Sequence, residues 1–296
     1  IEINPNNDLY ICNLLELLNI HKPIKENVQP LFKINQEYRD IEITTNSERL
    51  ISDHKVIDFY NEGLIIYKKY NLNLVSNLSQ IYKRNQTQLN CKRHKLIFSQ
   101  HNIIPKFCFG CYKVQVEPSS IIDLFKLFFL FNQIHFVNNN TRKCMIEMRP
   151  GIKGFYKGLI YCSSLEEAYQ ISDKINTRLI SNINSELTSI VKRGCSEYYL
   201  KFPEYKKISK SGIQKMNYNQ EWHKIEEEMD KENNDWSKEH KSIEGFNLNG
   251  FLIMRNWIGY AQKVGDKSVN TITNEKIKVP NSFEKVRRFL YTPNNI

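Results

Sequence analysis

Residues 112–134 read YKVQVEPSSIIDLFKLFFLFNQI, and the hydrophobic pattern of this stretch changes halfway. Residues 112–117 alternate in polarity, which is typical of a β-strand. Pro118, Ser119 and Ser120 follow, and a serine directly before an apolar run is a common N-cap of a helix. The apolar residues then continue to Ile134. The stretch therefore predicts a strand followed directly by an apolar helix.

The sequence downstream predicts three more strands and one more helix. The strands are expected at residues 143–148, 156–162 and 189–202, and the helix at 165–180. Pro150, Gly151 and Gly154 make the connection between the first two of these strands rich in turn residues, and Ser164 is placed to cap the helix. The resulting order is βαββαβ. We therefore expect an α+β protein whose centre, about residues 112–202, is a ferredoxin-like segment.

The flanking regions are predicted to be mainly helical. One short helix is expected over residues 74–85, whereas Pro23 and Pro30 indicate an irregular connector over residues 21–50. The predicted divisions are a helical N-terminal region, a ferredoxin-like segment with a cysteine site and a C-terminal helical extension, at 1–105, 106–208 and 209–296. One compact domain containing all three regions is the alternative.

Composition and charge indicate the class of partner. The formal net charge is +10, which favours anionic partners such as RNA or DNA, although lysine outnumbers arginine and a solvated basic surface is the plainer explanation.

The longest apolar run, residues 121–131, is about half of the ~20 residues that a membrane span needs. The beginning of the sequence has no charged segment followed by an apolar one. We therefore expect a cytoplasmic protein without a membrane span.

The chain has seven cysteines, an odd number that indicates free thiols, buried residues or metal ligands in a reducing compartment. In the expected sheet, Cys108 and Cys111 precede the first strand, Cys144 begins the second and Cys162 ends the third, so all four lie at one end. If the hairpin turn centres near Lys153, Cys144 and Cys162 are directly opposed. Four thiolates predict a zinc ion or a [4Fe–4S] cluster.

A second set of ligands lies closer together in the sequence. Cys91 and His94 precede Cys108 and Cys111 with a spacing close to that of a zinc knuckle, and His101 is an alternative to His94. The alternative without a metal is that Cys144 and Cys162 are simply small buried residues. A redox pair formed by Cys108 and Cys111 ranks below a metal site, because this pair precedes a strand and not a helix.

Two functional classes follow from these patterns. The first is a protein that binds a metal and serves as a binding or regulatory module for nucleic acid or another anionic partner. The second is an enzyme with an iron–sulfur or zinc centre, for which His94, His101 and Glu147 are candidate proton-transfer groups. Cys195 is a further candidate nucleophile, because Lys192 and Arg193 precede it and can lower the pKa of its thiol; a strand residue beside a glycine bulge is the alternative.

Residues 153–176, KGFYKGLIYCSSLEEAYQISDKIN, begin with Lys-Gly, have aromatic residues in the predicted strand and carry Glu-Glu-Ala in the following helix. The stretch resembles the third strand and second helix of RNA-recognition motif domains. That resemblance implies RNA binding by stacking of bases on tyrosine rings, with Tyr161 and Tyr112 in that role. The expected register places Tyr161 on the sheet face away from the helices.

Overall fold

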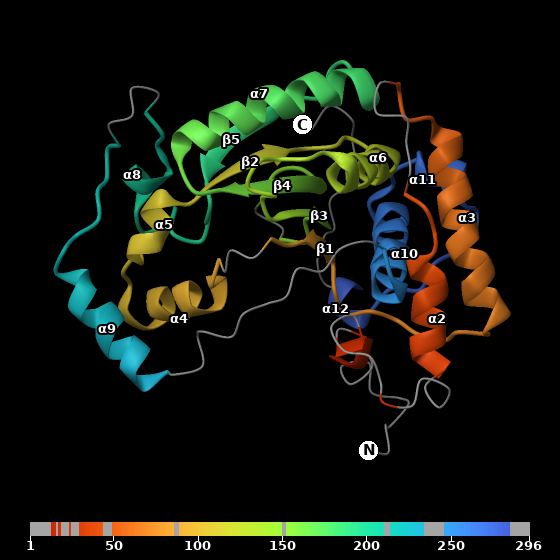
Figure 1. The fold of residues 1–296 in the computed structure, drawn as a ribbon, viewed down its shortest axis with the longest axis horizontal. Helices are drawn as coiled ribbons and strands as arrows, with labels where there is room; N and C mark the ends of the chain where they lie inside the picture. Colours follow the sequence, from red (N-terminus) through yellow and green to blue (C-terminus); the bar gives the residue numbers. More distant parts are fainter. Residues whose placement is uncertain are drawn as a thin grey trace.

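The computed structural model describes residues 13–15, 17–18, 24, 30–43, 49–85, 89–149, 152–209, 214–233 and 246–284. Within these ranges the chain is a mixed α+β protein, as predicted. Its strands are β1 (Gln80–Lys83), β2 (Tyr112–Val116), β3 (Arg142–Ile146), β4 (Tyr156–Cys162) and β5 (Ser189–Arg193). They form one five-stranded sheet in the order β1-β3-β4-β2-β5, with every neighbouring pair antiparallel (Figure 1).

The described helices occur before, between and after the strands in the sequence. They are α2 (Pro30–Arg39), α3 (Asp53–Lys69), α4 (Cys91–His101), α5 (Lys106–Gly110), α6 (Ile121–Gln133), α7 (Leu165–Asn182), α8 (Pro203–Lys206), α9 (Trp222–Glu232), α10 (Leu248–Val264), α11 (Val269–Ile272) and α12 (Asn281–Glu284). Every helix in the described ranges is too short or too polar to cross a bilayer.

Helices α6 and α7 pack on the sheet, α6 against β3 and β4, and α7 chiefly against β2 and β5. Both begin at the predicted serines: Ser120 Oγ accepts a hydrogen bond from Asp123 N, and Ser164 Oγ accepts one from Glu167 N, each at 3.1 Å. Gly158 in β4 allows the close approach of α6, because a Cβ added there would be 2.4 Å from Leu127. The sheet face that carries Gly158 is therefore the helix-covered face.

The neighbours of the four predicted strands are those that the sequence indicated: β2 lies between β4 and β5, and β3 pairs with β4. β1 was not predicted. It is formed by residues expected to be helical, and it pairs with β3 so that Ile81 is opposite Cys144. Ile81 also packs against the main core. The partner strand and this contact outweigh the local helical pattern.

Residues 30–39 form helix α2 instead of the irregular connector that was predicted. Pro30 is the first residue of this helix, a position where its fixed φ suits the helix and its missing N–H breaks no hydrogen bond. The helix buries Phe32, Ile34 and Tyr38, and Tyr38 Oη donates to the carbonyl of Gly63 at 2.9 Å. The proline therefore starts a packed helix.

The largest buried cluster contains residues from all three predicted regions. Helix α10 contributes many of them and contacts α2, α6, β1 and β3. It ends at Gly265, which has a φ of 81°. The next residue, Asp266, is 2% exposed and accepts hydrogen bonds from Ile121 N and Tyr156 Oη, both at 2.7 Å. This carboxylate joins the end of α10 to the start of α6 and to β4.

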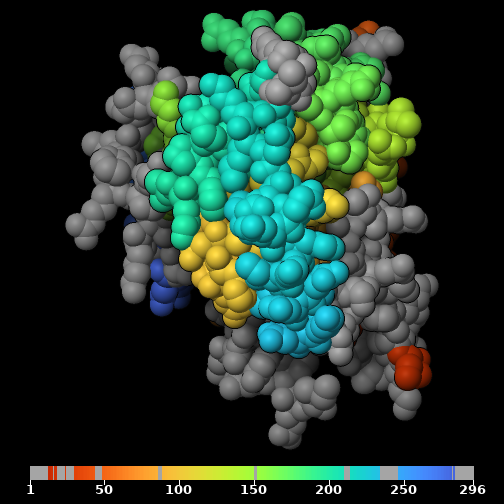
Figure 2. All heavy atoms as spheres, turned by 90° about the vertical axis from the view of Figure 1, so that its left-hand side faces the viewer, coloured from red at the N-terminus to blue at the C-terminus, as the bar shows by residue number. Residues whose placement is uncertain are grey.

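A second, smaller core lies at the opposite end of the sheet from α10 (Figure 1). Its buried members are Ile104, Cys108, Tyr198 and Tyr205, with Phe98, Phe109, Phe202 and Trp222 among those packed around them. Arg93 of α4 forms ion pairs with Glu226 and Asp230 of α9, at 2.9 and 2.6 Å. Figure 2 shows α9, in cyan, lying against the yellow segment that contains α4 and α5.

Candidate functional site

The structure separates the predicted cysteine quartet because the hairpin register differs from the expected one. Cys144 is opposite Gly158, and Cys162 is opposite Tyr112. The predicted pairing of Cys144 with Cys162 is therefore wrong, because the observed register is shifted by four residues along β4. Because Cys162 lies four residues beyond Gly158, about 13 Å of strand separates it from the position facing Cys144.

The four cysteines also lie in different surroundings. Cys144 and Cys162 belong to the main core, whereas Cys108 belongs to the small aromatic core with its Sγ 3.3 Å from Tyr198 Oη. Cys111 follows α5, and its Sγ lies against Gly194. Burial raises the pKa of Cys111 to about 12 and raises the pKa of Cys144 and Cys162 as well. These thiols are protonated at neutral pH and serve as packing groups.

The second predicted set is not gathered either. Cys91 begins α4 and is exposed, whereas His94 is 5% exposed and its ring stacks on Phe107 with the centroids 5.1 Å apart. Burial and the charge of Arg93 lower the pKa of His94 to about 4. Among the residues that the structure describes, no three His, Cys, Asp or Glu side chains are grouped to hold a metal ion. Cys12 lies outside those residues.

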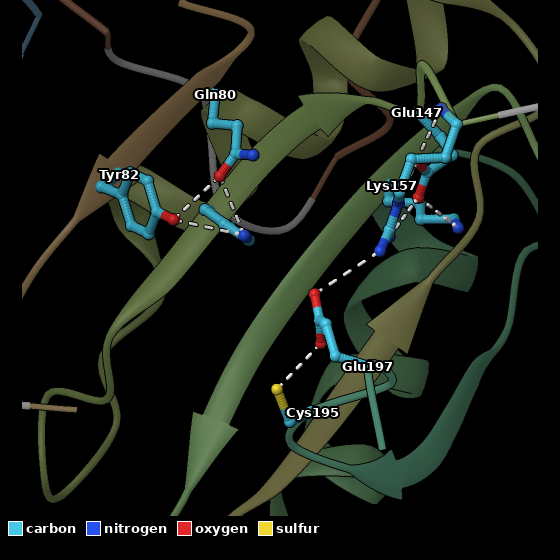
Figure 3. Close-up of polar contacts among 8 residues, drawn as sticks. Gln80, Tyr82, Glu147, Lys157, Cys195 and Glu197 are labelled. Carbon is cyan, nitrogen blue, oxygen red and sulfur yellow. Dashed lines mark hydrogen bonds and ion pairs between the residues drawn. The ribbon is translucent and has the colours of Figure 1, made fainter. Parts of the chain in front are cut away.

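The sheet face away from α6 and α7 carries a set of polar and basic side chains. Alternation along each strand places them there, opposite in direction to Gly158 and the core residues. They are Gln80 and Tyr82 from β1, Lys143 from β3, Lys157 and Tyr161 from β4, Lys113 and Gln115 from β2, and Lys192 from β5. We call this set the lysine face. Figure 3 shows two groups of its polar contacts, one around Gln80 and Tyr82 and one around Glu147 and Lys157.

Lys113 and Lys143 lie on either side of Tyr161 at the centre of the lysine face. Lys113 is directly opposite Tyr161, and Lys143 Nζ is 5.9 Å from the centroid of the Tyr161 ring. Lys143 Nζ donates to Gln80 Oε1 at 2.9 Å and to Tyr82 Oη at 3.2 Å. Lys113 is 7% exposed, and no described side chain accepts a hydrogen bond from it. Neither ammonium group forms an ion pair with a described carboxylate.

Burial dominates the electrostatics of these two lysines. It lowers the pKa of Lys113 to about 8, against the opposing effect of the Glu197 charge. Burial also lowers the pKa of Lys143 to about 8. A desolvated ammonium is unfavourable, and an anion bound beside it would offset that cost.

The other charged side chains of this region form one linked network. Glu147, 1% exposed, accepts hydrogen bonds from Lys157 Nζ at 2.9 Å and from Arg149 Nε at 2.8 Å. Burial alone would raise the pKa of Glu147, but these bonds outweigh it and lower the pKa to about 2. Arg149 Nη1 also lies 3.6 Å from Glu197 Oε1. The network continues from Glu197 to Cys195 (Figure 3).

The lysine face and its surroundings are basic in sum. The described cations are Lys113, Lys143, Lys157, Lys192, Arg84 and Arg149, and the described anions are Glu117, Glu147 and Glu197. Six positive and three negative groups leave a net charge of +3. Arg84 lies over the ring of Tyr82, 4.0 Å from its centroid, at the β1 edge of the sheet.

The sequence predicted the position of Tyr161 but not the lysines around it. The expected placement of Tyr161 on the face away from the helices is confirmed by its pairing with Lys113 and its contact with Lys143. The missed signal was available: Lys113 and Gln115 alternate with the apolar residues of β2, and Lys143 in β3 and Lys157 in β4 lie on the same face of the sheet.

Comparisons with protein-family models, with curated proteins and with solved structures found no match to this chain.

Proposed function

We propose that this protein is a binding module for an anionic partner, with single-stranded nucleic acid as the ligand and the lysine face as its binding surface. One observation carries the proposal: Lys113 and Lys143 are desolvated on either side of Tyr161, and no described carboxylate pairs with them. In a folded protein, a buried charge is normally paired. A phosphate group is an anion of suitable size and charge to complete this pair.

The rest of the face supports nucleic acid over a lone phosphate ion. Tyr161 and Tyr82 provide aromatic rings between the cations, and bases of single strands stack on such rings. The half-exposed Lys192 and Arg149 continue the positive charge beyond the centre. The formal charge of +10 supports attraction of a polyanion from solution.

We further propose that β2 to β5, with α6 and α7, form a ferredoxin-like unit to which β1 is added as an edge strand. The order β3-β4-β2-β5 and the antiparallel neighbours support this classification. The proposal assigns no role to zinc or an iron–sulfur cluster: of the cysteines predicted to bind one, Cys144 and Cys162 belong to the main core and Cys108 to the small aromatic core.

The test measures binding of a fluorescent single-stranded RNA and of the matching DNA by anisotropy, over a series of salt concentrations. The wild-type chain should bind with an affinity that falls as salt rises, because lysines displace counterions from phosphates. Lys113→Met and Lys143→Met should each weaken binding and lower the slope of log K against log salt by about 0.7.

Lys267→Met is the matched control, since Lys267 is exposed and lies beyond α10, outside the lysine face. It should bind as the wild type does. Equal losses in Lys113→Met and Lys267→Met would show that only the overall charge matters and would contradict the proposed surface. Binding of inorganic phosphate without binding of RNA or DNA would replace nucleic acid with a small phosphorylated ligand.

A further inference from the structure

The loop after β5 places a thiol and a carboxylate in direct contact beside the lysine face. Cys195 Sγ donates a hydrogen bond to Glu197 Oε2 at 2.8 Å, as Figure 3 shows. Cys195 is only partly buried, and the Glu197 side chain is 39% exposed, so solvent and small molecules reach both groups.

The residues before Cys195 hold this loop in place. Arg193 is 1% exposed and donates to the carbonyls of Phe109 and Tyr205 and to Tyr112 Oη, at 2.7, 3.2 and 2.8 Å. Gly194 N donates to the carbonyl of Cys111 at 2.9 Å. Two consecutive residues are thus hydrogen-bonded to β2 and to the residues directly before it, which gives the thiol a rigid support.

The sequence suggested that Lys192 and Arg193 lower the pKa of the Cys195 thiol, and the structure shows that this is wrong. Arg193 is turned toward Tyr112 and Tyr205, while Lys192 lies 3.7 Å from Glu117. Burial and the Glu197 charge instead raise the pKa of Cys195 to about 12. The thiol therefore keeps its proton at rest and needs a base in contact to become a nucleophile.

Two cations act on the carboxylate that could serve as this base. Arg149 Nη1 is 3.6 Å from Glu197 Oε1, and the charge of Lys113 also acts on Glu197. Lys113 is the second, independent indication of a ligand here: it is 7% exposed, and no described side chain accepts a hydrogen bond from it. The charge of Glu197 is in turn the main opposing influence on this buried ammonium.

We propose that Cys195 is the nucleophile of an acyl-transfer site that hydrolyses a carboxylic ester, with Glu197 as general base and Lys113 as the cation that stabilises the oxyanion. The proposal goes beyond nucleic-acid binding and does not depend on it. It rests on the thiol–carboxylate contact, the fixed loop and the unpaired buried ammonium.

The proposed reaction has two halves. Glu197 takes the proton from Cys195 as Sγ attacks the carbonyl carbon, and the carbonyl electron pair moves to oxygen beside Lys113. The carbon–oxygen bond to the alcohol then breaks, the alcohol leaves with the proton held by Glu197, and a thioester remains. Water attacks this thioester and gives a proton to Glu197; the carbon–sulfur bond breaks, the acid leaves, and the sulfur recovers the proton.

The experiment treats the full chain with p-nitrophenyl acetate and follows nitrophenolate release, intact mass and peptide mapping. The wild type should release a burst of one nitrophenolate per chain and carry one acetyl group at Cys195. Cys195→Ser should lose the burst, and Glu197→Gln should slow it about 100-fold, the usual effect of losing a general base. Lys113→Met should also slow it about 100-fold.

Two variants serve as controls. Cys91→Ser removes an exposed thiol and Glu204→Gln neutralises an exposed glutamate of α8, and both should keep the wild-type burst. Equal acetylation of Cys91 and Cys195 in the wild type would overturn the proposal, and this result needs no variant to fold. A burst in folded Glu197→Gln within about twofold of the wild-type rate would also overturn it, because Cys195 would then react as an ordinary thiol.

Discussion

Gly194 lies directly against Cys111: a Cβ added to Gly194 would be 2.3 Å from Cys111 Sγ. Gly194 N also donates to the Cys111 carbonyl, so the two residues are in contact through backbone and side chain. The thiol of Cys111, expected to bind a metal, thus fills the space that a glycine leaves open. This contact sets the position of the loop that carries Cys195.

Gly194→Ala should destabilise the protein by roughly 2 kcal/mol, because the added methyl group overlaps the sulfur. Cys111→Ala in the same chain should recover part of that loss by removing the sulfur atom. Urea unfolding of the two single variants and the double variant measures the coupling. Additive effects of the two substitutions would show that the methyl group does not meet Cys111.

Lys113→Met should stabilise the protein by about 3 kcal/mol at pH 7, because it removes a buried charge. Burial lowers the pKa of Lys113 from its usual 10.5 to about 8, and this shift measures the cost of the charge. Below pH 8 Lys113 is charged in both folded and unfolded chains, and the cost is complete. Between pH 8 and 10.5 only the unfolded chain keeps the proton, so the cost disappears as pH rises.

The advantage of Lys113→Met in urea unfolding should therefore be large at pH 7 and small at pH 10.5. Lys267→Met, which changes an exposed lysine, should stay within about 0.5 kcal/mol of the wild type at both values. A variant less stable than the wild type at pH 7 would mean that Lys113 has a favourable partner.

His94 should make the protein sensitive to mild acid. Its pKa is about 4 in the folded chain and near 6.5 when unfolded, so its contribution is complete above pH 6.5. As pH falls from 6.5 to 4, the unfolded chain binds a proton that the folded chain does not, which costs roughly 3 kcal/mol by pH 4. Chemical unfolding over this pH range measures the loss.

His94→Phe should remove the part of this pH dependence that the imidazole causes, and it keeps an aromatic ring against Phe107. His101→Gln is the matched control, because His101 is exposed at the end of the same helix; it should retain the wild-type dependence. If His94→Phe and the wild type lose stability in parallel below pH 6.5, other groups cause the acid sensitivity.

Glu147→Gln should cost about 3 kcal/mol, since it leaves the buried Lys157 without its counter-charge. The wild-type carboxylate, with its pKa lowered to about 2, stabilises the fold above pH 4.5, and this contribution is lost as pH falls toward 2. Thermal unfolding at several pH values should show that the variant lacks this pH-dependent contribution to stability. Glu204→Gln, an exposed charge change, should remain near the wild type; an equal loss there would argue against the buried pair.

Regular local patterns predicted most of the central elements. Ser164, the helix that follows it and strand β4 are where the sequence placed them, because a serine cap and an alternating strand depend on neighbouring residues.

The errors concern features that distant residues determine. β1 depends on β3, more than fifty residues away, and helix α2 depends on contacts of Tyr38 and its neighbours with α3 and α10. The predicted hairpin register was also wrong, and it differs from the observed register by four residues along β4. This shift dispersed the predicted cysteine site. The lysine face was missed because burial of a polar residue is a property of the whole sheet.

The pairing of β1 with β3 has a consequence for folding during synthesis. Residues 80–83 leave the ribosome well before residues 142–146, so the future edge strand has no partner until β3 and its neighbours have been made. The sheet cannot be completed in the order in which it is translated. Such non-local pairing slows folding, and an unpaired strand remains available to other chains in the interval.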